Sequence, residues 1–412
     1  MSSPPPRLAA LHDHQVIQRT SADCARVVLA HGEVELPVGG PYDIRDPSGG
    51  VLASDVFVGD LWLMAGQSNM EGHGDWAELE PPHPSVQVLG MDRVWRPAEE
   101  PLHRRWSSPD PVHWDAMTDE RRLIELAAFE ALPREYGTGL GLSFAKEMLQ
   151  RTGVPVGLIS SAHGGTTMAG WSPELRDLEG QSLYGSMLNQ VRFAGGRVAG
   201  VLWYQGESDG SAEHGYEYAE RLAALHHALR TDLGDIPRLQ VQLGRMTGDP
   251  VELHGLLPLW TDEDWSTIRE AQRVGTATAV VSAIDLDLYD FVHLSSAALK
   301  RLGRRLARVA CGAPPITIDA VTGTPSGDVA VCVGGTSSLP VGESVRGFCW
   351  HSPTGRLPAD AVVLDGCTIA VQRSSAQGTL SYGWGLNPEA RLVDAFDMTL
   401  PAFGPVAVQA IE

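Results

Sequence analysis

Long apolar runs are missing from this chain of 412 residues, although 43% of its residues are hydrophobic. A membrane-spanning helix needs about 18–20 consecutive apolar residues, and no segment approaches that length. The stretch MSSPPPRLAALHDHQ at the start holds no apolar core of the kind found in secretory signal peptides. These absences predict a cytoplasmic protein with no membrane partner, and secretion by another route stays open.

Positive charge is also scarce. Lysine and arginine total 31 against 51 aspartates and glutamates, the formal net charge is -20, and Lys146 and Lys300 are the only lysines. Nucleic acids and anionic lipid surfaces are bound through clustered cations, which this composition does not offer. A neutral small molecule or a carbohydrate is therefore the expected partner, and nucleic acid is not. Oligomeric state is left open.

Cysteine is rare and irregularly placed. The chain has five, and no Cys-x-x-Cys pair or Cys/His spacing typical of a zinc site accompanies them. We therefore expect neither a metal nor another cofactor. Two alternatives remain for the thiols: all are reduced, or a pair bonds within the part of the chain after residue 310, which contains four of them. The residues are Cys24, Cys311, Cys332, Cys349 and Cys367.

The pattern of the chain changes twice, at residues 58 and 312. Residues 1–57 carry strand-like alternation with Pro and Gly turns, and residues 312–412 show the same character. We expect two β-rich flanks, which could pack together because the first is short for an independent fold. Residues 58–311 instead alternate short apolar runs with helical patterns, which predicts an α/β domain with a parallel sheet covered on both faces.

The elements of this central domain follow from hydrophobic spacing. In 212–232, for example, Tyr218, Leu222, Leu225 and Leu229 recur at helical intervals and form one apolar face. Residues 72–138 show no clear period, and their tryptophans favour an ordered wall over a site. The predicted strands are 58–66, 154–161, 198–205, 237–244 and 277–286, and the predicted helices are 139–152, about 183–194, 212–232, 264–275 and 295–310.

Polar clusters follow four of the predicted strands. Parallel sheets bind ligands at the carboxyl ends of their strands, so we expect these clusters to share one edge. Turns alone do not readily account for four of them. The clusters are Ser68, Gly164-Gly165, Gln205-Gly206-Glu207 and the loop with Asp290 and His293.

The loop before 295–310 has the residues of a general base. A serine hydroxyl such as that of Ser68 is a poor nucleophile until an imidazole takes its proton. The three-residue spacing of Asp290 and His293 lets the carboxylate orient the ring and support its charged form. Taken alone, the same spacing also fits a helix cap beside a surface histidine.

Acyl transfer further needs donors for the oxygen that becomes negative. The backbone N–H of Ser68, the exposed backbone at Gly165 and the side-chain amide of Gln205 are the candidates. A Gly-Gly pair alone is more often a turn. Ser208 is an alternative nucleophile, because GESDG matches Gly-x-Ser-x-Gly after a strand.

The blocks GQSNM, VGLISSAHGGT, LWYQGESDG and DFVHLSSAALKRLGRRLA together resemble the SGNH hydrolases, and within them the acetylxylan esterase and sialate O-acetylesterase group of carbohydrate esterases. The resemblance implies a three-layer, flavodoxin-like domain. It implies Ser68 as nucleophile, His293 as base and Asp290 as its orienting acid. It also implies that Ser68, Gly165 and Gln205 form the oxyanion hole.

Other positions carry weaker expectations. The same resemblance makes Glu207 either a second acid that supports the histidine or a buried structural carboxylate. His163 stands where this group usually has tryptophan or an apolar residue, so it either bonds substrate or packs. Trp95, Trp106, Trp114 and Trp171 either face sugar rings or pack in loops. The candidate substrate-binding residues are Gln67, Asn69, His163, Trp171 and Trp95.

The expected activity is removal of acetyl groups from a sugar, of sialic acid or xylan type, through an acetyl-enzyme. Two alternatives stay open: a lipase-like or thioester hydrolase that uses the same residues, and a non-catalytic glycan-binding protein. The acidic surface disfavours the former, and the complete Ser/Asp/His set disfavours the latter.

Overall fold

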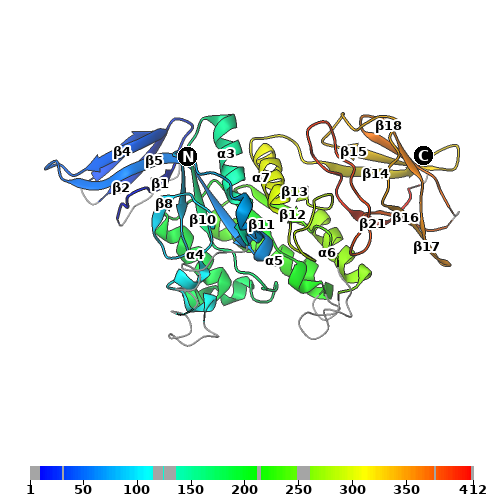
Figure 1. Cartoon of the computed structure of the whole chain (residues 1–412), viewed down its shortest axis with the longest axis horizontal. Coiled ribbons are helices and arrows are strands. Elements are labelled where there is room, and N and C mark those ends of the chain that lie inside the picture. Colours follow the sequence, from blue (N-terminus) through cyan, green and yellow to red (C-terminus); the bar gives the residue numbers. More distant parts are fainter. Residues whose placement is uncertain are drawn as a thin grey trace. The chain divides into compact units, whose positions relative to one another are not determined.

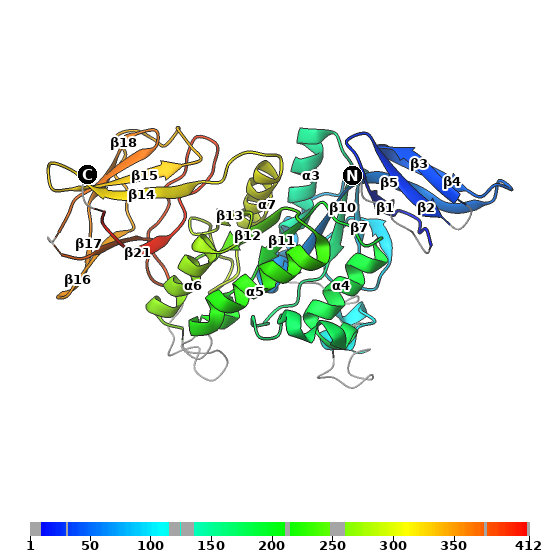
Figure 2. The same cartoon turned by 180° about the vertical axis from the view of Figure 1, so that it is seen from behind.

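The computed structural model describes residues 10–29, 32–114, 124, 136–210, 215–247, 260–374 and 377–409 (Figures 1 and 2). Its contacts divide the chain into two compact units. The first runs to Trp203 and includes 224–238 and 296–311, and the second holds 204–223, 239–295 and the residues from 312 onward. The predicted division at 57/58 and 311/312 stays a prediction.

Strand β5 (Val51–Gly66) is the longest element of the first unit. Its first half pairs with β1 (Val16–Gln18) and with β4 (Gly39–Arg45), and its second half pairs in parallel with β10 (Val156–Ser160). Every residue from Val56 onward is buried. The predicted strand 58–66 is therefore confirmed, but it begins earlier, at Val51. The N-terminal strands β1 and β4 pair with its first half.

The sheet extends on both sides of this pair. Strand β10 also pairs in parallel with β7 (Val86–Leu89), β8 (Trp95–Pro97) lies antiparallel beyond β7, and β11 (Gly200–Tyr204) neighbours β5. Because β5 and β10 run the same way, the loops that follow them leave from one edge of the sheet. The central parallel sheet that the sequence predicts is thus present.

Strands β7 and β8 correct the expectation for 72–138. We predicted a long stretch without regular structure, yet these strands supply one side of the sheet, and Val86–Leu89 is entirely buried. Each of these strands spans four residues or fewer, which is too short for an alternation of apolar and polar residues to be recognised in the sequence. Residues 115–123 and 125–135 of this stretch lie outside the described part of the chain.

The predicted helices are confirmed within two residues wherever the chain is described. Those longer than one turn are α3 (Gly141–Thr152), α4 (Leu183–Phe193), α5 (Gly215–Leu233), α6 (Asp262–Val274) and α7 (Ser296–Ala310). The predicted start of α5 at 212–214 lies outside the described residues. The apolar face of α5 is buried as expected, with Tyr218, Leu222, Leu225 and Leu229 each at most 1% exposed.

Helices α3 and α7 run side by side in the first unit (Figures 1 and 2). Gly303 makes this closeness possible, because a Cβ there would lie 2.3 Å from the Leu140 carbonyl oxygen. A larger residue would push the helices apart. The middle of α7 therefore packs closely on the start of α3, the helix that precedes β10.

The second unit contains a parallel strand pair and a β-rich C-terminal part. Strands β12 (Arg238–Gln242) and β13 (Ala279–Ser282) pair in parallel beside α6. After α7 the described chain forms two four-stranded antiparallel sheets, which confirms the predicted all-β C-terminal region (Figure 1). They contain β14 (Thr317–Gly323), β15 (Val329–Gly334), β19 (Thr368–Val371) and β18 (Ala361–Asp365), and β17 (Gly355–Pro358), β16 (Phe348–Ser352), β20 (Thr379–Tyr382) and β21 (Phe403–Ala407).

Smaller elements complete the fold. All five cysteines are free thiols, which favours the reduced alternative over a disulfide in the C-terminal region. Among the described residues, no helix is long and apolar enough to cross a membrane. The short elements are β2 (Cys24–Leu29), β3 (Gly32–Pro37), α1 (Ser68–Glu71), β6 (Gly74–Asp75), β9 (Tyr136–Thr138) and the 3₁₀ helices Trp76–Glu78, Arg105–Ser107, Pro111–His113, Pro173–Gln181 and Glu207–Asp209.

Candidate active site

Ser68 lies directly after the carboxyl end of β5, as the first residue of the one-turn helix α1. Its side chain is 7% exposed, and its neighbours Gln67 and Asn69 are 3% and 0% exposed. The two amides, which the sequence makes candidates for substrate binding, therefore do not face solvent. They are buried around the turn that holds the serine, and a role in substrate binding stays a prediction.

The glycine pair is brought against this serine. The His163 backbone N–H donates to the Gly66 carbonyl at 3.0 Å, which extends the β5–β10 pairing beyond the strands. Gly164 then packs so closely that an added Cβ would lie 3.4 Å from the Ser68 Cβ and 2.9 Å from Glu71 Oε2. Gly165 follows with φ +74°, in the left-handed region that favours glycine. Position 164 thus favours glycine because a Cβ would crowd Glu71 Oε2, and position 165 favours glycine because of its backbone conformation.

Glu71 is a residue of this loop that sequence reasoning missed. Its Oε2 accepts a hydrogen bond from the Gly164 N–H at 2.7 Å, across 93 positions of sequence. The carboxylate therefore fastens the glycine loop to the helix that begins with Ser68. Its place three residues after Ser68 in GQSNMEG was the available signal, but the sequence did not indicate the partner.

Asp290 and His293 lie in a tight loop of the second unit. The loop is closed by an antiparallel bridge between Leu288 and Leu294. Asp290 Oδ2 is 2.7 Å from His293 Nδ1, and its Oδ1 accepts the backbone N–H groups of Val292 at 2.8 Å and His293 at 2.7 Å. The contact that the three-residue spacing predicts is present.

These hydrogen bonds set the charge of Asp290. Burial by itself raises the pKa of this carboxyl, but the donors from His293 and Val292 outweigh it and lower the pKa to about 2. The side chain is an ionised acceptor at any pH above about 4, and the proton between the residues is on His293 Nδ1. The ring therefore presents Nε2 as its basic nitrogen.

The Gln-Gly-Glu block follows β11. The Gln205 side-chain amide donates to Asp209 Oδ2 at 2.5 Å, and its backbone carbonyl accepts from Tyr218 and Gln272. Asp209 is fully buried. Like Glu71, it is a residue of the site that sequence reasoning missed. An amide nitrogen carries two hydrogens, and this contact uses one of them. Glu207 is 4% exposed, which fits both of its predicted roles.

Ser208 lies in the middle of the 3₁₀ helix Glu207–Asp209, and its φ is negative. A nucleophile elbow needs a strained strand-to-helix turn that lifts the serine out. Ser208 lacks that geometry, which disfavours the alternative nucleophile.

The burial of the tryptophans bears on their two predicted alternatives, sugar contact and loop packing. Trp95 is 3% exposed in β8, and Trp171 is fully buried. The Trp171 ring packs edge-to-face on Trp203 with 5.2 Å between centroids, and its N–H donates to Thr166 Oγ1. Neither ring offers an open face for a sugar, so the packing alternative is favoured for both. Trp106 and Trp114 are half-buried.

Comparison with known proteins identifies the family. The model of the carbohydrate esterases described as sialic acid-specific acetylesterases matches residues 58–311. The chain belongs to this family. It is a carboxylic ester hydrolase acting on acetylated carbohydrate, as the motifs predicted.

Individual relatives are more distant. The esterase is 28% identical over 285 residues to a "probable carbohydrate esterase" of Arabidopsis thaliana, covering 62% of this chain and 92% of the relative. It is 24% identical over 179 residues to the sialate O-acetylesterase of Homo sapiens, covering 38% and 32%. A crystal structure of a carbohydrate acetylesterase from Xanthomonas citri has 24% identity and a TM-score of 0.65, and the match covers 97% and 99% of the two chains. That last likeness concerns the fold.

The structure groups the predicted residues of the esterase in two sets. Ser68, His163 and the glycine pair come together in the first unit, while Asp290 contacts His293 in the second. The second unit also holds Gln205 and Glu207. The approach of Ser68 to His293 stays a prediction.

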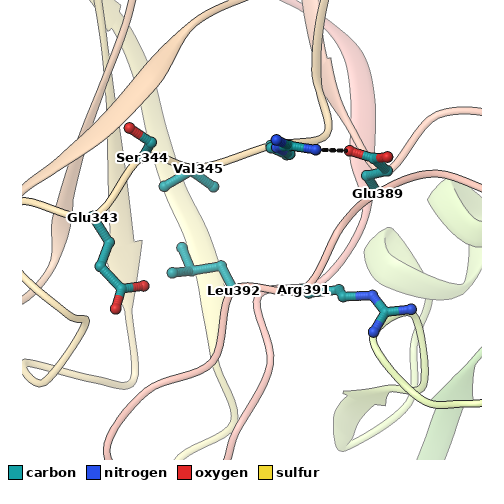
Figure 3. A pocket seen from close by; sticks show the side chains of 7 residues that line it. Glu343, Ser344, Val345, Glu389, Arg391 and Leu392 are labelled. Atoms are coloured by element: carbon teal, nitrogen blue, oxygen red, sulfur yellow. Dashed lines mark hydrogen bonds and ion pairs between the residues drawn. The ribbon is translucent and has the colours of Figure 1, made fainter.

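A cavity of about 470 Å³ lies in the C-terminal β-rich part of the esterase (Figure 3). Arg346 and Glu389 on its wall already form an ion pair of 2.8 Å. Its described lining includes a serine but no histidine, so it lacks the imidazole that activates a serine in a Ser/His/Asp arrangement. Within the described chain, no group of three or more His, Cys, Asp or Glu side chains is placed to hold a metal ion.

Buried histidines give the esterase an acid sensitivity. Burial lowers the pKa of His103 and His163 to about 4, and that of His113 well below 6.5. Unfolding lets each take up a proton below about pH 6.5, so the free energy of unfolding decreases as pH falls toward 4. Glu100 opposes them, because burial raises its pKa to about 7. We expect a net uptake of about two protons on unfolding near pH 5.5, measured by urea denaturation between pH 4.5 and 7.

Two variants check this assignment. Glu100→Gln removes the opposing group and is expected to increase the net proton uptake on unfolding near pH 5.5 by about one proton. His227→Gln replaces an exposed histidine on α5 and is expected to leave the slope unchanged. A wild-type stability that is flat from pH 7 to 4.5 would contradict neutral burial of the three histidines.

Proposed function

We propose that the esterase is an SGNH-type serine hydrolase in which Ser68 attacks the acetyl carbonyl of an acetylated sugar. The observation that carries the proposal is the close packing of Gly164 on Ser68, which sets a glycine-rich backbone beside the nucleophile at the carboxyl edge of the sheet. The family match over 58–311 supports the acetyl and carbohydrate parts.

His293 is the proposed general base. The Nδ1–H to Asp290 contact leaves Nε2 free of a proton, so it can accept the Ser68 hydroxyl proton during attack. The protonated ring then donates to the leaving sugar oxygen. In the second half-reaction the same nitrogen removes a proton from water, the water adds to the acetyl carbonyl, and acetate leaves as Ser68 recovers its proton.

Hydrogen-bond donors that stabilise the negatively charged oxygen are the second requirement of the reaction. The proposed donors are the backbone N–H groups of Ser68 and Gly165 and the side-chain amide of Gln205. The left-handed φ of Gly165 turns its peptide in a way that a residue with a Cβ rarely adopts. The Gln205 amide donates one hydrogen to Asp209 Oδ2, which fixes the orientation of the amide group that carries the second hydrogen.

Glu71 is expected to position this hole. Glu71→Ala removes the acceptor of the Gly164 N–H, so the glycine loop loses its attachment to α1. A displacement of about 1 Å costs about 10²-fold in rate, so we expect kcat to fall by about that factor while KM changes less than about threefold. Steady-state kinetics on p-nitrophenyl acetate measures both constants.

Two further variants separate positioning from general damage. Glu71→Gln keeps an acceptor oxygen and is expected to recover kcat to within about tenfold of wild type. Glu78→Ala removes an exposed carboxylate in the neighbouring 3₁₀ helix and should leave kcat unchanged. Equal kcat values for Glu71→Ala and wild type would rule out the role.

The proposed substrate is a sugar carrying O-acetyl groups, of the sialic acid or xylan-oligosaccharide type. Acetate release from a panel of acetylated sialic acids and acetylated xylo-oligosaccharides, wild type beside Ser68→Ala, tests it. p-Nitrophenyl acetate should turn over faster than the octanoate, because the proposal requires a small acyl group. Faster octanoate hydrolysis, with no acetate released from any sugar, would favour the lipase-like alternative.

A further inference from the structure

A line of buried polar groups leads from the protein surface to His163. Arg93 donates to both carboxylate oxygens of Asp110, at 2.7 and 2.8 Å. Ser186 Oγ donates to Asp110 Oδ2 at 2.7 Å, and His113 Nε2 lies 3.0 Å from the same hydroxyl oxygen. His113 Nδ1 lies 3.1 Å from His163 Nδ1. All five groups belong to the first unit.

The protons along this line can be assigned in order. A carboxylate only accepts, so the Ser186 hydroxyl hydrogen goes to Asp110 and the hydroxyl oxygen accepts from His113 Nε2–H. A neutral His113 then has an unprotonated Nδ1, which accepts from His163 Nδ1–H. The other ring nitrogen of His163, Nε2, consequently carries a lone pair. Ionised Asp110 therefore selects the tautomer of His163 through Ser186 and His113.

The surroundings keep both rings neutral. Burial lowers the pKa of each, and the Arg105 guanidinium lowers both further. His103 acts on His113 in the same direction, while the Glu71 carboxylate raises the pKa of His163 without restoring it to its ordinary value. A neutral His163 with a protonated Nδ1 can accept a hydrogen bond at Nε2 but cannot donate one there.

We propose that His163 Nε2 accepts a hydrogen bond from a free hydroxyl of the sugar, and that Asp110, Ser186 and His113 position it by holding this tautomer. The inference rests on the proposed function. His163 immediately precedes Gly164, whose backbone packs on Ser68, so the residue lies next to the proposed nucleophile. The site thereby distinguishes a partly acetylated sugar, which has hydroxyl donors, from a fully acetylated one, which has none.

Nitrogen-15 NMR of the histidine rings tests the tautomer without any substrate. In the wild type we expect His163 to carry its proton on Nδ1. In Asp110→Asn, Arg93 retains the amide oxygen and the amide NH₂ turns to Ser186, which reverses the donors along the line and puts the proton on Nε2 of His163. Asp92→Asn is the matched control, because Asp92 pairs with Arg96 outside the line. A wild-type proton on Nε2 would overturn the inference.

Kinetics tests the hydroxyl contact. The quantity is the ratio of kcat/KM for a methyl glycoside with one acetyl group to that for its fully acetylated counterpart, using the best sugar of the panel. His163→Phe is expected to lower this ratio about tenfold, the value of one hydrogen bond, with partial recovery in His163→Gln. Asp110→Asn should lower it as well, and Asp92→Asn should not.

The outcomes separate this inference from the proposed function. If the wild type releases no acetate from any sugar, the proposed function fails. If the wild type is active and His163→Phe keeps the wild-type ratio, the proposed function stands and the hydroxyl contact is wrong. If the ratio falls in His163→Phe but not in Asp110→Asn, His163 still contacts the sugar, but the buried line does not set its tautomer.

Discussion

Ser68→Ala is expected to lower kcat by about 10⁴- to 10⁶-fold, with the protein still folded. The oxygen that forms the acetyl-enzyme is lost, and water alone does not replace it. The substitution removes a single oxygen from a side chain that is 7% exposed, so the turn around it has little reason to rearrange. Acetate release and p-nitrophenyl acetate hydrolysis measure the effect, and circular dichroism checks the fold.

Ser208→Ala is the matched control for this result. Both serines follow a strand, but Ser208 lies within a 3₁₀ helix and is expected to be replaceable with less than about a twofold change in kcat. If Ser68→Ala retained activity while Ser208→Ala lost it, the Gly-x-Ser-x-Gly interpretation would be correct, and the assignment of the nucleophile would be wrong.

Asp290→Asn is expected to lower kcat by about 10⁴-fold. An amide in place of the carboxylate no longer forces the proton onto His293 Nδ1, and it cannot stabilise the ring when it becomes charged. The pKa of Asp290 is about 2, below its ordinary value, so its favourable effect is present above about pH 4 and is lost only as pH falls through 2. The loss should therefore be similar from pH 5 to 9.

Asp287→Asn is the control from the same loop. Asp287 is largely exposed and lies 3.4 Å from Arg245, so its replacement should leave kcat within about twofold. kcat measured across pH 5 to 9 for both variants distinguishes the roles. A pH-dependent loss in Asp290→Asn, large at pH 9 and absent at pH 5, would contradict a carboxylate that is ionised throughout.

The α/β succession could be read from residue spacing because burial requires it. A strand covered on both faces must be apolar throughout, as in Val156–Ser160, and a helix packed on one face repeats its apolar residues every three or four positions, as α5 does. Strand β7 escaped because four residues are too few to establish either period. Its signal was an apolar run between Pro84-Ser85 and Gly90.

Side-chain roles were less predictable than elements. Trp171 was a candidate either to face a sugar or to pack in its loop, and its ring packs on Trp203 and is fully buried. Conversely, the contacts of Glu71 and His113 could not be predicted, because their partners Gly164 and His163 lie far away in sequence. Only pairing of β5 with β10 brings Glu71 to the glycine loop.

The sequence by itself determined the order of elements, the family and the Asp290–His293 contact, because each depends on residues that are neighbours or that repeat at a short period. The tertiary structure decided what lies around Ser68 and its glycine loop: which glycine packs on the serine, which carboxylate holds that glycine, and which buried histidine contacts His163. These depend on contacts between distant segments, whose geometry is set when parallel strands align their ends and bury the polar groups between them.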